Sequence, residues 1–264
     1  HVHEIIEHPH LLAKMYPKVV SFFSYKIIFN TQASFNQFKR YKNSIDKKSV
    51  VIHNGQNRTF PFISNEEKIH LREDVFGADN SKIFIGLIGR ISRLKGQQLL
   101  LKAFKNLTHS YNNIHLVYVG SAPDGQEHYL ENLKQKVISK NLDHHVTIVD
   151  FQENIWPYYD ALDIIVVPST EPESFGLVAT EAMLSKKPVI GSNLGGLVEI
   201  IVDDKTGYLF EPKNVHDLEE KIKILLDNPE KIIEFGQNGH QRVLSNFSTK
   251  KYVEGIKKEF DTIT

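Results

Sequence analysis

Short apolar runs alternate with helical patterns between Lys82 and Phe210, and this alternation constrains the fold more than any other feature of the sequence. The runs are Ile83–Ile88, Ile114–Val119, Val146–Val149, Ile164–Val167, Pro188–Ile190 and Gly207–Phe210. Several are continuous and β-branched, as in strands that are buried on both faces. The segments between them have helical periodicity with polar faces; examples are Gly96–Ser110, Gln126–Asn141 and Gly176–Ser185. The pattern predicts an α/β fold with a parallel sheet wrapped by helices.

A smaller unit of the same style precedes this region. It is predicted to contain a helix over Leu11–Tyr25, a strand over Lys26–Asn30, a helix over Ala33–Tyr41 and a strand over Ser49–Ile52. Because two strands do not make a stable sheet domain, we expect this unit to be part of a second domain. The polar stretch Gln56–Ser81 is interpreted as a linker. Further helices are predicted over Asp217–Asp227, Pro229–Phe235 and Thr249–Phe260.

Composition limits the classes of protein that are possible. With 264 residues, 41% of them apolar, the chain can form one full domain plus a piece. Its 32 Lys and Arg balance 32 Asp and Glu, which argues against a dedicated nucleic-acid binder. The absence of cysteine excludes disulfides and fits a cytoplasmic protein. No apolar run approaches the ~18 residues of a membrane span, so we expect the protein to be soluble or peripheral.

The start of the chain has two unusual properties. Residues 1–50 contain eight Lys and Arg but three Asp and Glu, which leaves a local excess of five positive charges. This excess is either the solvated face of two helices or a surface for an anionic membrane or acceptor. The chain also begins without Met, on an apolar, His-rich stretch. We therefore expect that part of the natural protein precedes His1.

The first candidate site is a basic, glycine-containing loop between a predicted strand and a predicted helix. Gly89 and Gly96 would let the backbone approach a ligand, while Arg90 and Lys95 could bind a diphosphate. The loop lies at the carboxyl edge of the predicted sheet, where open α/β sheets bind ligands. The alternative is an ordinary surface turn.

The second candidate is a pair of glutamates, Glu173 and Glu181, with seven residues between them. Ser174 is the predicted N-cap of a helix, which would put Glu181 about two turns inside on a mostly apolar face. The helix start offers free backbone amides to an anion, and the carboxylates suit sugar or ribose hydroxyls. The amides are those of Phe175, Gly176 and Leu177. The alternative is a pair of structural acids.

Two weaker signals remain. The stretch 191–196 (GSNLGG) follows a strand and precedes a helix with Glu199, so it either lines the same crevice or serves tight packing. The opening His1-Val2-His3-Glu4 could be a metal site or the remains of an affinity tag. Because it does not clearly provide enough ligands, no metal site is predicted.

These motifs, in this order, resemble the retaining glycosyltransferases of family 4 (glycosyl transferases group 1), which have the GT-B fold of two Rossmann-like domains. The resemblance runs from His1 to about Ser245, and the glutamate pair with Phe175-Gly176 is its most specific part. It also includes His-x-His-Glu, Asn54-Gly55, Gly89-Arg90, Lys95-Gly96, Gly120, Pro168-Ser169, Gly195-Gly196, Glu199 and Thr206-Gly207.

The resemblance implies roles for individual residues. Arg90 and Lys95 would contact the donor diphosphate, and the amides of Phe175–Leu177 would meet the sugar or phosphate. Glu173 would approach the transferred sugar, and Glu181 would hold the ribose. His3 matches a histidine that reaches the reacting sugar from the other domain, so His3 and Glu173 are the expected catalytic residues. Gln152 and the pair Gln56-Asn57 depart from the usual pattern, which leaves the base preference and the detail of the domain connection open.

The resemblance also implies a domain plan. Residues 1–60 would be the remnant of an acceptor-binding domain, 61–81 a linker, and 82–245 the complete donor-binding domain. Residues 246–264 would form a helix that packs back toward the first piece. The strands and acceptor loop that begin the family's first domain would lie before His1.

The function implied is transfer of a sugar from a UDP-, GDP- or ADP-sugar to a hydroxyl, with retention and without a metal or other cofactor. A glycan or lipid-linked acceptor of bacterial-type cell-envelope synthesis (lipopolysaccharide or capsule) is expected, at the cytoplasmic face of the membrane. Two alternatives stay open: a module that binds nucleotide sugars without catalysis, and a nucleotide-sugar epimerase.

Overall fold

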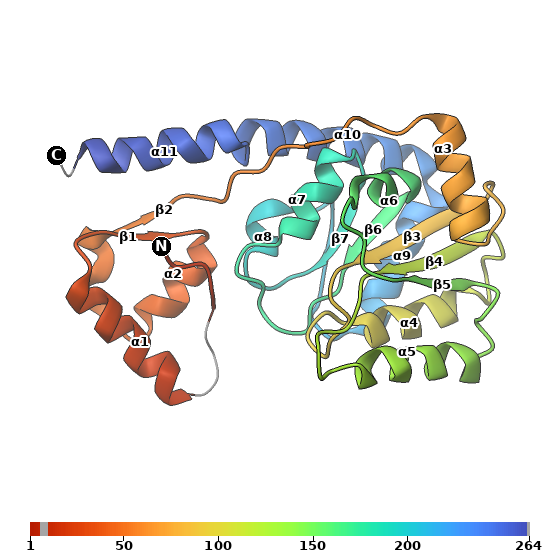
Figure 1. The fold of residues 1–264 in the computed structure, drawn as a ribbon, viewed down its shortest axis with the longest axis horizontal. Coiled ribbons are helices and arrows are strands. Elements are labelled where there is room, and N and C mark those ends of the chain that lie inside the picture. The colour runs from red at the N-terminus through yellow and green to blue at the C-terminus, as the bar shows by residue number, and fades with distance from the viewer. Residues whose placement is uncertain (6–9, 263–264) are drawn as a thin grey trace.

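The computed structural model describes residues 1–5 and 10–262, which form two parallel β-sheets of unequal size (Figure 1). The larger sheet has the strand order β5-β4-β3-β6-β7-β8. Its strands are β3 (Ile83–Ile88), β4 (Ile114–Val119), β5 (Val146–Val149), β6 (Ile164–Val167), β7 (Val189–Ser192) and β8 (Gly207–Phe210). All six predicted strands of this sheet are confirmed. Counted from β3, the order is that of a Rossmann fold, with its switch point between β3 and β6.

Helices cover both faces of the larger sheet, and a separate apolar core fills each interface. One core is formed with α4 (Gln97–Leu107), α5 (His128–Ser139) and α9 (Val215–Asp227). The other is formed with α6 (Trp156–Ala161), α7 (Leu177–Leu184), α8 (Leu197–Ile200) and α10 (Pro229–Asn246). Both faces of β3 are therefore buried: Ile85 and Leu87 face the first core, whereas Phe84 and Ile88 face the second. The predicted α/β class is confirmed. We call residues 76–246 the large domain.

The first part of the chain, residues 1–5 and 10–53, forms a smaller body that we call the N-terminal unit. It contains α1 (His10–Phe23), β1 (Ile27–Phe29), α2 (Gln32–Lys39), the 3₁₀ helix η1 (Asn43–Lys48) and β2 (Ser49–Val51). β1 pairs in parallel with β2, and Val2 makes an isolated bridge to Phe29. A small apolar core of Val2, Ile27, Phe29, Phe38 and Ile45 holds these elements together.

The connecting segment between the two bodies is more ordered than its polar composition suggested. Residues 65–75 form α3 (Asn65–His70) and the π-helical turn η2 (Leu71–Val75). Ser64 and Glu67 make a capping box at the start of α3, which explains why this polar stretch is helical. The buried Arg72 binds the carbonyl of Ala161 at 2.8 Å and the Asp163 carboxylate at 2.6 Å. This segment is therefore fastened to the large domain.

The last two helices return the chain to the N-terminal unit. After α10, α11 (Thr249–Asp261) runs along the top of Figure 1 as far as β1 and β2. Lys26 and Glu259 form an ion pair of 2.7 Å there. The chain thus crosses between the two bodies twice, and the crossings are bonded to each other because the amide of Gln56 donates to the carbonyl of Phe247 at 2.7 Å.

Candidate functional site

The loops that follow β3 and β6 meet at the switch point of the larger sheet. The ammonium of Lys95 lies 2.6 Å from Oε1 of Glu173, and the hydroxyl of Ser169 donates to the same oxygen at 2.5 Å. The Lys95 and Glu173 side chains are 26% and 16% exposed, so the pair lies in a recess but can be reached. Residues from two predicted motifs are therefore brought together.

Glycine at position 96 allows this close approach of the two loops. Its φ is +74°, and a Cβ atom would lie 1.9 Å from the carbonyl oxygen of Pro168. The left-handed conformation and the lack of space both require glycine. Gly96 is also the N-cap of α4, so the loop passes directly into the helix.

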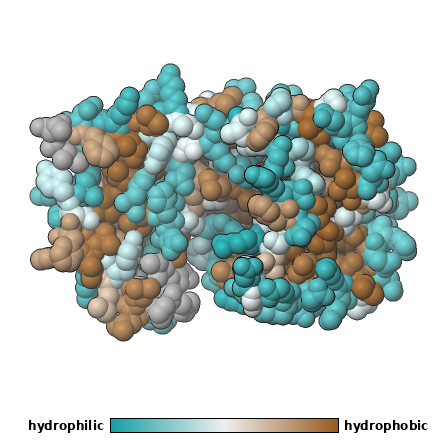
Figure 2. Space-filling model, viewed as in Figure 1, coloured by the Kyte–Doolittle hydropathy of each residue, from teal (hydrophilic) through white to brown (hydrophobic). Residues whose placement is uncertain are grey.

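Two cavities lie side by side at this edge and share Arg90. The switch-point cleft, of about 290 Å³, lies beyond β3 and β6; Lys95, Glu173 and Ser174 line it from the large domain and Glu4 and Ile5 from the N-terminal unit. The strand-end pocket, of about 330 Å³, lies beyond β3, β4 and β5 and is lined by Gly89, Phe151 and Gln152 among others. Figure 2 shows the hollow between the two bodies. The exposed Arg90 guanidinium could bind a ligand that extends from one cavity into the other.

The helix after the glutamate motif starts later than predicted. α7 begins at Leu177, and its N-cap is Gly176 with φ +110° rather than Ser174. Ser174 adopts a different role, because its carbonyl accepts a hydrogen bond from the Thr31 hydroxyl at 2.7 Å. Phe175 is buried against His53 and Phe247, so only its backbone can serve a ligand.

Glu181 lies apart from Glu173 and is not among the residues that line either cavity. The Tyr159 hydroxyl donates to its Oε2 at 2.7 Å, and the Gln56 amide donates to its Oε1 at 2.8 Å. Burial raises the pKa of Glu181. The two hydrogen bonds act to lower this pKa, but burial has the larger effect. The carboxylate is therefore held in a fixed position by α6 and the connecting segment.

His3 is exposed in the N-terminal unit, one residue before the cleft-lining Glu4. Its ring lies 4.4 Å from that of His1, centroid to centroid. The Asn30 amide donates to the His3 carbonyl at 3.4 Å, and the neighbouring Val2 bridges to β1. His3 is therefore next to a cleft-lining residue in the sequence, but it is not itself among the residues that line the cleft.

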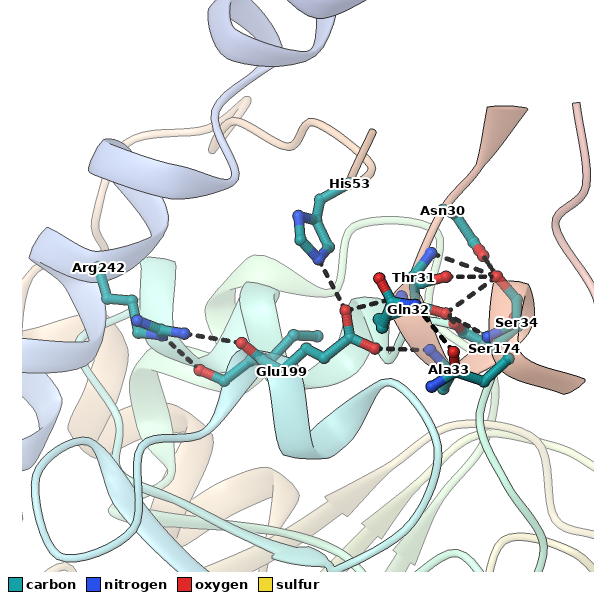
Figure 3. A network of polar contacts seen from close by, with 11 residues as sticks. Asn30, Thr31, Gln32, Ala33, Ser34, His53, Ser174, Glu199 and Arg242 are labelled. Atoms are coloured by element: carbon teal, nitrogen blue, oxygen red, sulfur yellow. Dashed lines mark hydrogen bonds and ion pairs between the residues drawn. The ribbon is translucent and has the colours of Figure 1, made fainter. Parts of the chain in front are cut away.

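Sequence reasoning missed the polar network that joins the two bodies (Figure 3). The Glu199 carboxylate accepts hydrogen bonds of 2.9 Å from the backbone amides of Gln32 and Ala33 and from the His53 ring. The sequence places Glu199 on a helix after the glycine stretch 191–196 but carries no sign of these partners. The glycine stretch 191–196 serves packing here, since the amide of Gly196 donates to the Glu173 carbonyl at 2.7 Å.

Across residues 1–5 and 10–262, no cluster of three or more His, Cys, Asp or Glu is arranged to hold a metal ion. In the same residues, no helix has the length and apolar character to cross a membrane.

The strand order and the switch-point cleft define a doubly wound α/β protein with a cleft at the carboxyl ends of β3 and β6, the place where open α/β sheets bind ligands. The family described as Glycosyl transferases group 1 matches residues 70–242, and the chain belongs to this family.

Similar proteins agree with this family. An uncharacterized glycosyltransferase of Methanocaldococcus jannaschii is 30% identical over 232 residues, 86% of this chain and 58% of that protein. The lipopolysaccharide 1,2-N-acetylglucosaminetransferase of Salmonella typhimurium is 30% identical over 201 residues, 73% of this chain and 52% of that protein. The chain thus spans about half the length of the curated relatives it matches.

A solved structure matches almost the whole chain. The crystal structure of Anabaena HepE in complex with UDP and glucose has a TM-score of 0.90 and 25% sequence identity. The match covers 99% of this chain and 70% of that one. The GT-B type of fold is confirmed for both bodies of the chain.

Proposed function

We propose that this chain provides the donor site of a retaining family 4 glycosyltransferase, which transfers a sugar from a nucleoside diphosphate sugar to a hydroxyl group. The observation that carries the proposal is the Lys95–Glu173 pair of 2.6 Å at the switch point, with Arg90 lining the same cleft. The cations of Arg90 and Lys95 and the carboxylate of Glu173 suit a ligand with a diphosphate at one end and hydroxyl groups at the other.

In this proposal the diphosphate lies between Arg90 and Lys95. The bond from the anomeric carbon to the diphosphate oxygen breaks, the acceptor oxygen bonds to the same face of that carbon, and the acceptor proton passes to the leaving phosphate. The two cations stabilise the charge that develops on the leaving group, so no metal or other cofactor is needed. Glu173 orients the sugar, and His3 reaches it from the N-terminal unit.

The proposal also assigns the remaining parts of the donor. The strand-end pocket beside Arg90 would take the base, between Phe151 and Gln152. Glu181, fixed by Tyr159 and Gln56, would hold the ribose through the lone pairs that these bonds leave free. The start of α7, with Gly176 as N-cap and no side-chain cap, would offer backbone amides to the sugar or phosphate.

We further propose a glycan or lipid-linked acceptor of cell-envelope synthesis, reached at the cytoplasmic face of the membrane. The relative that acts on lipopolysaccharide supports this acceptor class. α1 supports the location, because it exposes Leu11, Met15, Phe22 and Phe23 beside the positive charge of this part of the chain. Flotation with vesicles rich in anionic lipid, compared with neutral vesicles, tests the location. Equal recovery with both kinds would contradict an electrostatic membrane contact.

The donor site is tested by thermal unfolding with UDP, GDP and ADP. At a hundredfold excess over Kd, binding stabilises the protein by about 2.7 kcal/mol, which raises Tm by about 5–10 °C. We expect one nucleotide to give this shift and Arg90→Ala to lose it. If no nucleotide shifts Tm, the assignment of the donor site to this chain is wrong. Retention is tested by NMR of the sugar that is released when the enzyme hydrolyses the donor. The anomer that forms first must be the anomer present in the donor.

A further inference from the structure

The start of helix α2 is held by a residue of the other body. Thr31 is the N-cap of α2, and its side chain forms a capping box with Ser34. The first backbone amides of a helix have no partner within the helix. Those of Gln32 and Ala33 donate instead to Oε2 and Oε1 of Glu199, each at 2.9 Å. One carboxylate of the large domain therefore binds the start of a helix in the N-terminal unit.

Glu199 is itself held in position by the large domain. The guanidinium of Arg242 on α10 donates to the carbonyls of Glu199 and Ile200, each at 2.7 Å, and so fixes α8 (Figure 3). The Glu199 side chain is 17% exposed. Burial acts to raise the pKa of Glu199, but the bonds from His53, Gln32 and Ala33 together outweigh it and lower the pKa. The carboxylate is charged and pre-oriented toward α2.

The same helix start also touches the glutamate motif. The Thr31 hydroxyl donates to the carbonyl of Ser174, the residue after Glu173, at 2.7 Å. When α2 is bound in this way, the N-terminal unit lies against the switch-point cleft and contributes Glu4 and Ile5 to its wall. The contacts of Glu199 and the composition of the cleft are thus properties of one arrangement of the two bodies.

We propose that Glu199 is a positioning residue: it binds the start of α2 and holds the N-terminal unit against the switch-point cleft. Glu199 touches no residue of the Lys95–Glu173 pair in this role; it acts through α2. The benefit of this arrangement rests on the proposed function, because closure of the cleft would bring His3 toward the donor sugar. The holding contact itself does not depend on that function.

The experiment measures the separation of the two bodies. The chain has no cysteine, so Lys47→Cys on η1 and Lys102→Cys on α4, both exposed, give two unique sites for spin labels. The distance distribution between the labels is recorded for the otherwise unchanged chain, for Glu199→Ala and for Glu199→Gln. Glu220→Gln, an exposed change on α9, is the matched control. UDP, GDP and ADP affinities are measured on the same samples.

We expect one narrow distance in the parent and in the control, and a broader, longer distribution in both Glu199 variants. Loss of two charge-assisted bonds should reduce the ratio of closed to open molecules about tenfold or more. Nucleotide affinity should stay within about twofold, because Glu199 lines neither cavity and is assigned no part of the proposed donor. An unchanged distance would overturn the proposal. A changed distance together with a loss of nucleotide affinity would also overturn it, because Glu199 would then act within the large domain. If the parent binds no nucleotide, the donor proposal fails while the distances still decide the role of Glu199.

Discussion

The ammonium of Lys95 and the carboxylate of Glu173 are 2.6 Å apart although 77 residues lie between them in the chain. The contact joins the loop after β3 to the loop after β6. In this contact the two charges neutralise each other. In the proposed complex Lys95 would instead bind the diphosphate of the donor, and Glu173 would bind its sugar. Variants of either residue can therefore separate binding of the diphosphate from recognition of the sugar.

Replacement of Lys95 by Met should weaken nucleotide binding. A charge-assisted bond contributes about 1.5–3 kcal/mol, so we expect Kd for the preferred nucleotide to rise about 10-fold to 100-fold. Calorimetric titration measures this change. Lys102→Met, on the exposed side of α4, is the control and should leave Kd unchanged. Equal affinities for the Lys95 variant and its parent would remove Lys95 from the diphosphate site.

Replacement of Glu173 by Gln should spare the nucleotide but not the sugar. We expect the affinity for the free nucleoside diphosphate to stay within about threefold, because the proposed contacts of Glu173 are to sugar hydroxyls. The affinity for the matching nucleotide sugar should fall by about tenfold or more. Titrations with both ligands check the difference. A parallel loss of both affinities would place Glu173 at the diphosphate instead.

Replacement of Glu181 by Gln should stabilise the fold and weaken nucleotide binding. Burial raises the pKa of Glu181 above its ordinary value of 4.5, so the charged form is disfavoured in the folded state. This cost is present above the folded pKa and disappears as the pH falls below the unfolded value. Urea unfolding should therefore show the variant to be more stable at neutral pH, with a difference that shrinks toward pH 4.5. A variant that is less stable at neutral pH would mean that the bonds from Tyr159 and Gln56 outweigh the burial.

Replacement of Gly96 by Ala should be clearly more costly than the same change at Gly125. Both glycines have a positive φ, +74° and +75°, but a Cβ at Gly125 would meet nothing within 4 Å. We expect Gly125→Ala to cost about 1–2 kcal/mol from backbone strain alone. Gly96→Ala adds the clash with the Pro168 carbonyl and should cost about 3 kcal/mol or more. Denaturant unfolding of the two variants measures the difference. Equal costs would show that the loops can separate without loss of stability.

The larger sheet could be predicted from the sequence because its signal is local. A run such as Ile164–Val167 is apolar at every position, as is typical of a strand that is buried on both faces. The position of Lys95 and Glu173 at one edge of the sheet follows from topology, because both come after a strand and parallel strands bring their carboxyl ends to one edge. Both inferences needed no knowledge of distant packing.

Other features depend on tertiary contacts and could not be predicted. The helix predicted over Pro229–Phe235 continues to Asn246 as α10. Gly236 lies inside this helix and serves close packing, because a Cβ there would lie 2.1 Å from the carbonyl oxygen of Lys186. The partners of the Glu199 carboxylate are likewise more than 140 residues away in sequence, and no local pattern connects them.

The paired crossings of the chain, where Gln56 is bonded to Phe247, limit how the two bodies can move. Two covalent connections held side by side act as a hinge: they resist sliding and leave rotation about their common line as the easy motion. His53, which binds Glu199, lies three residues before this line in the sequence. A rotation there would break the Glu199 contact with α2 and withdraw Glu4 from the cleft in one movement. The hinge angle is therefore the single coordinate that sets both events.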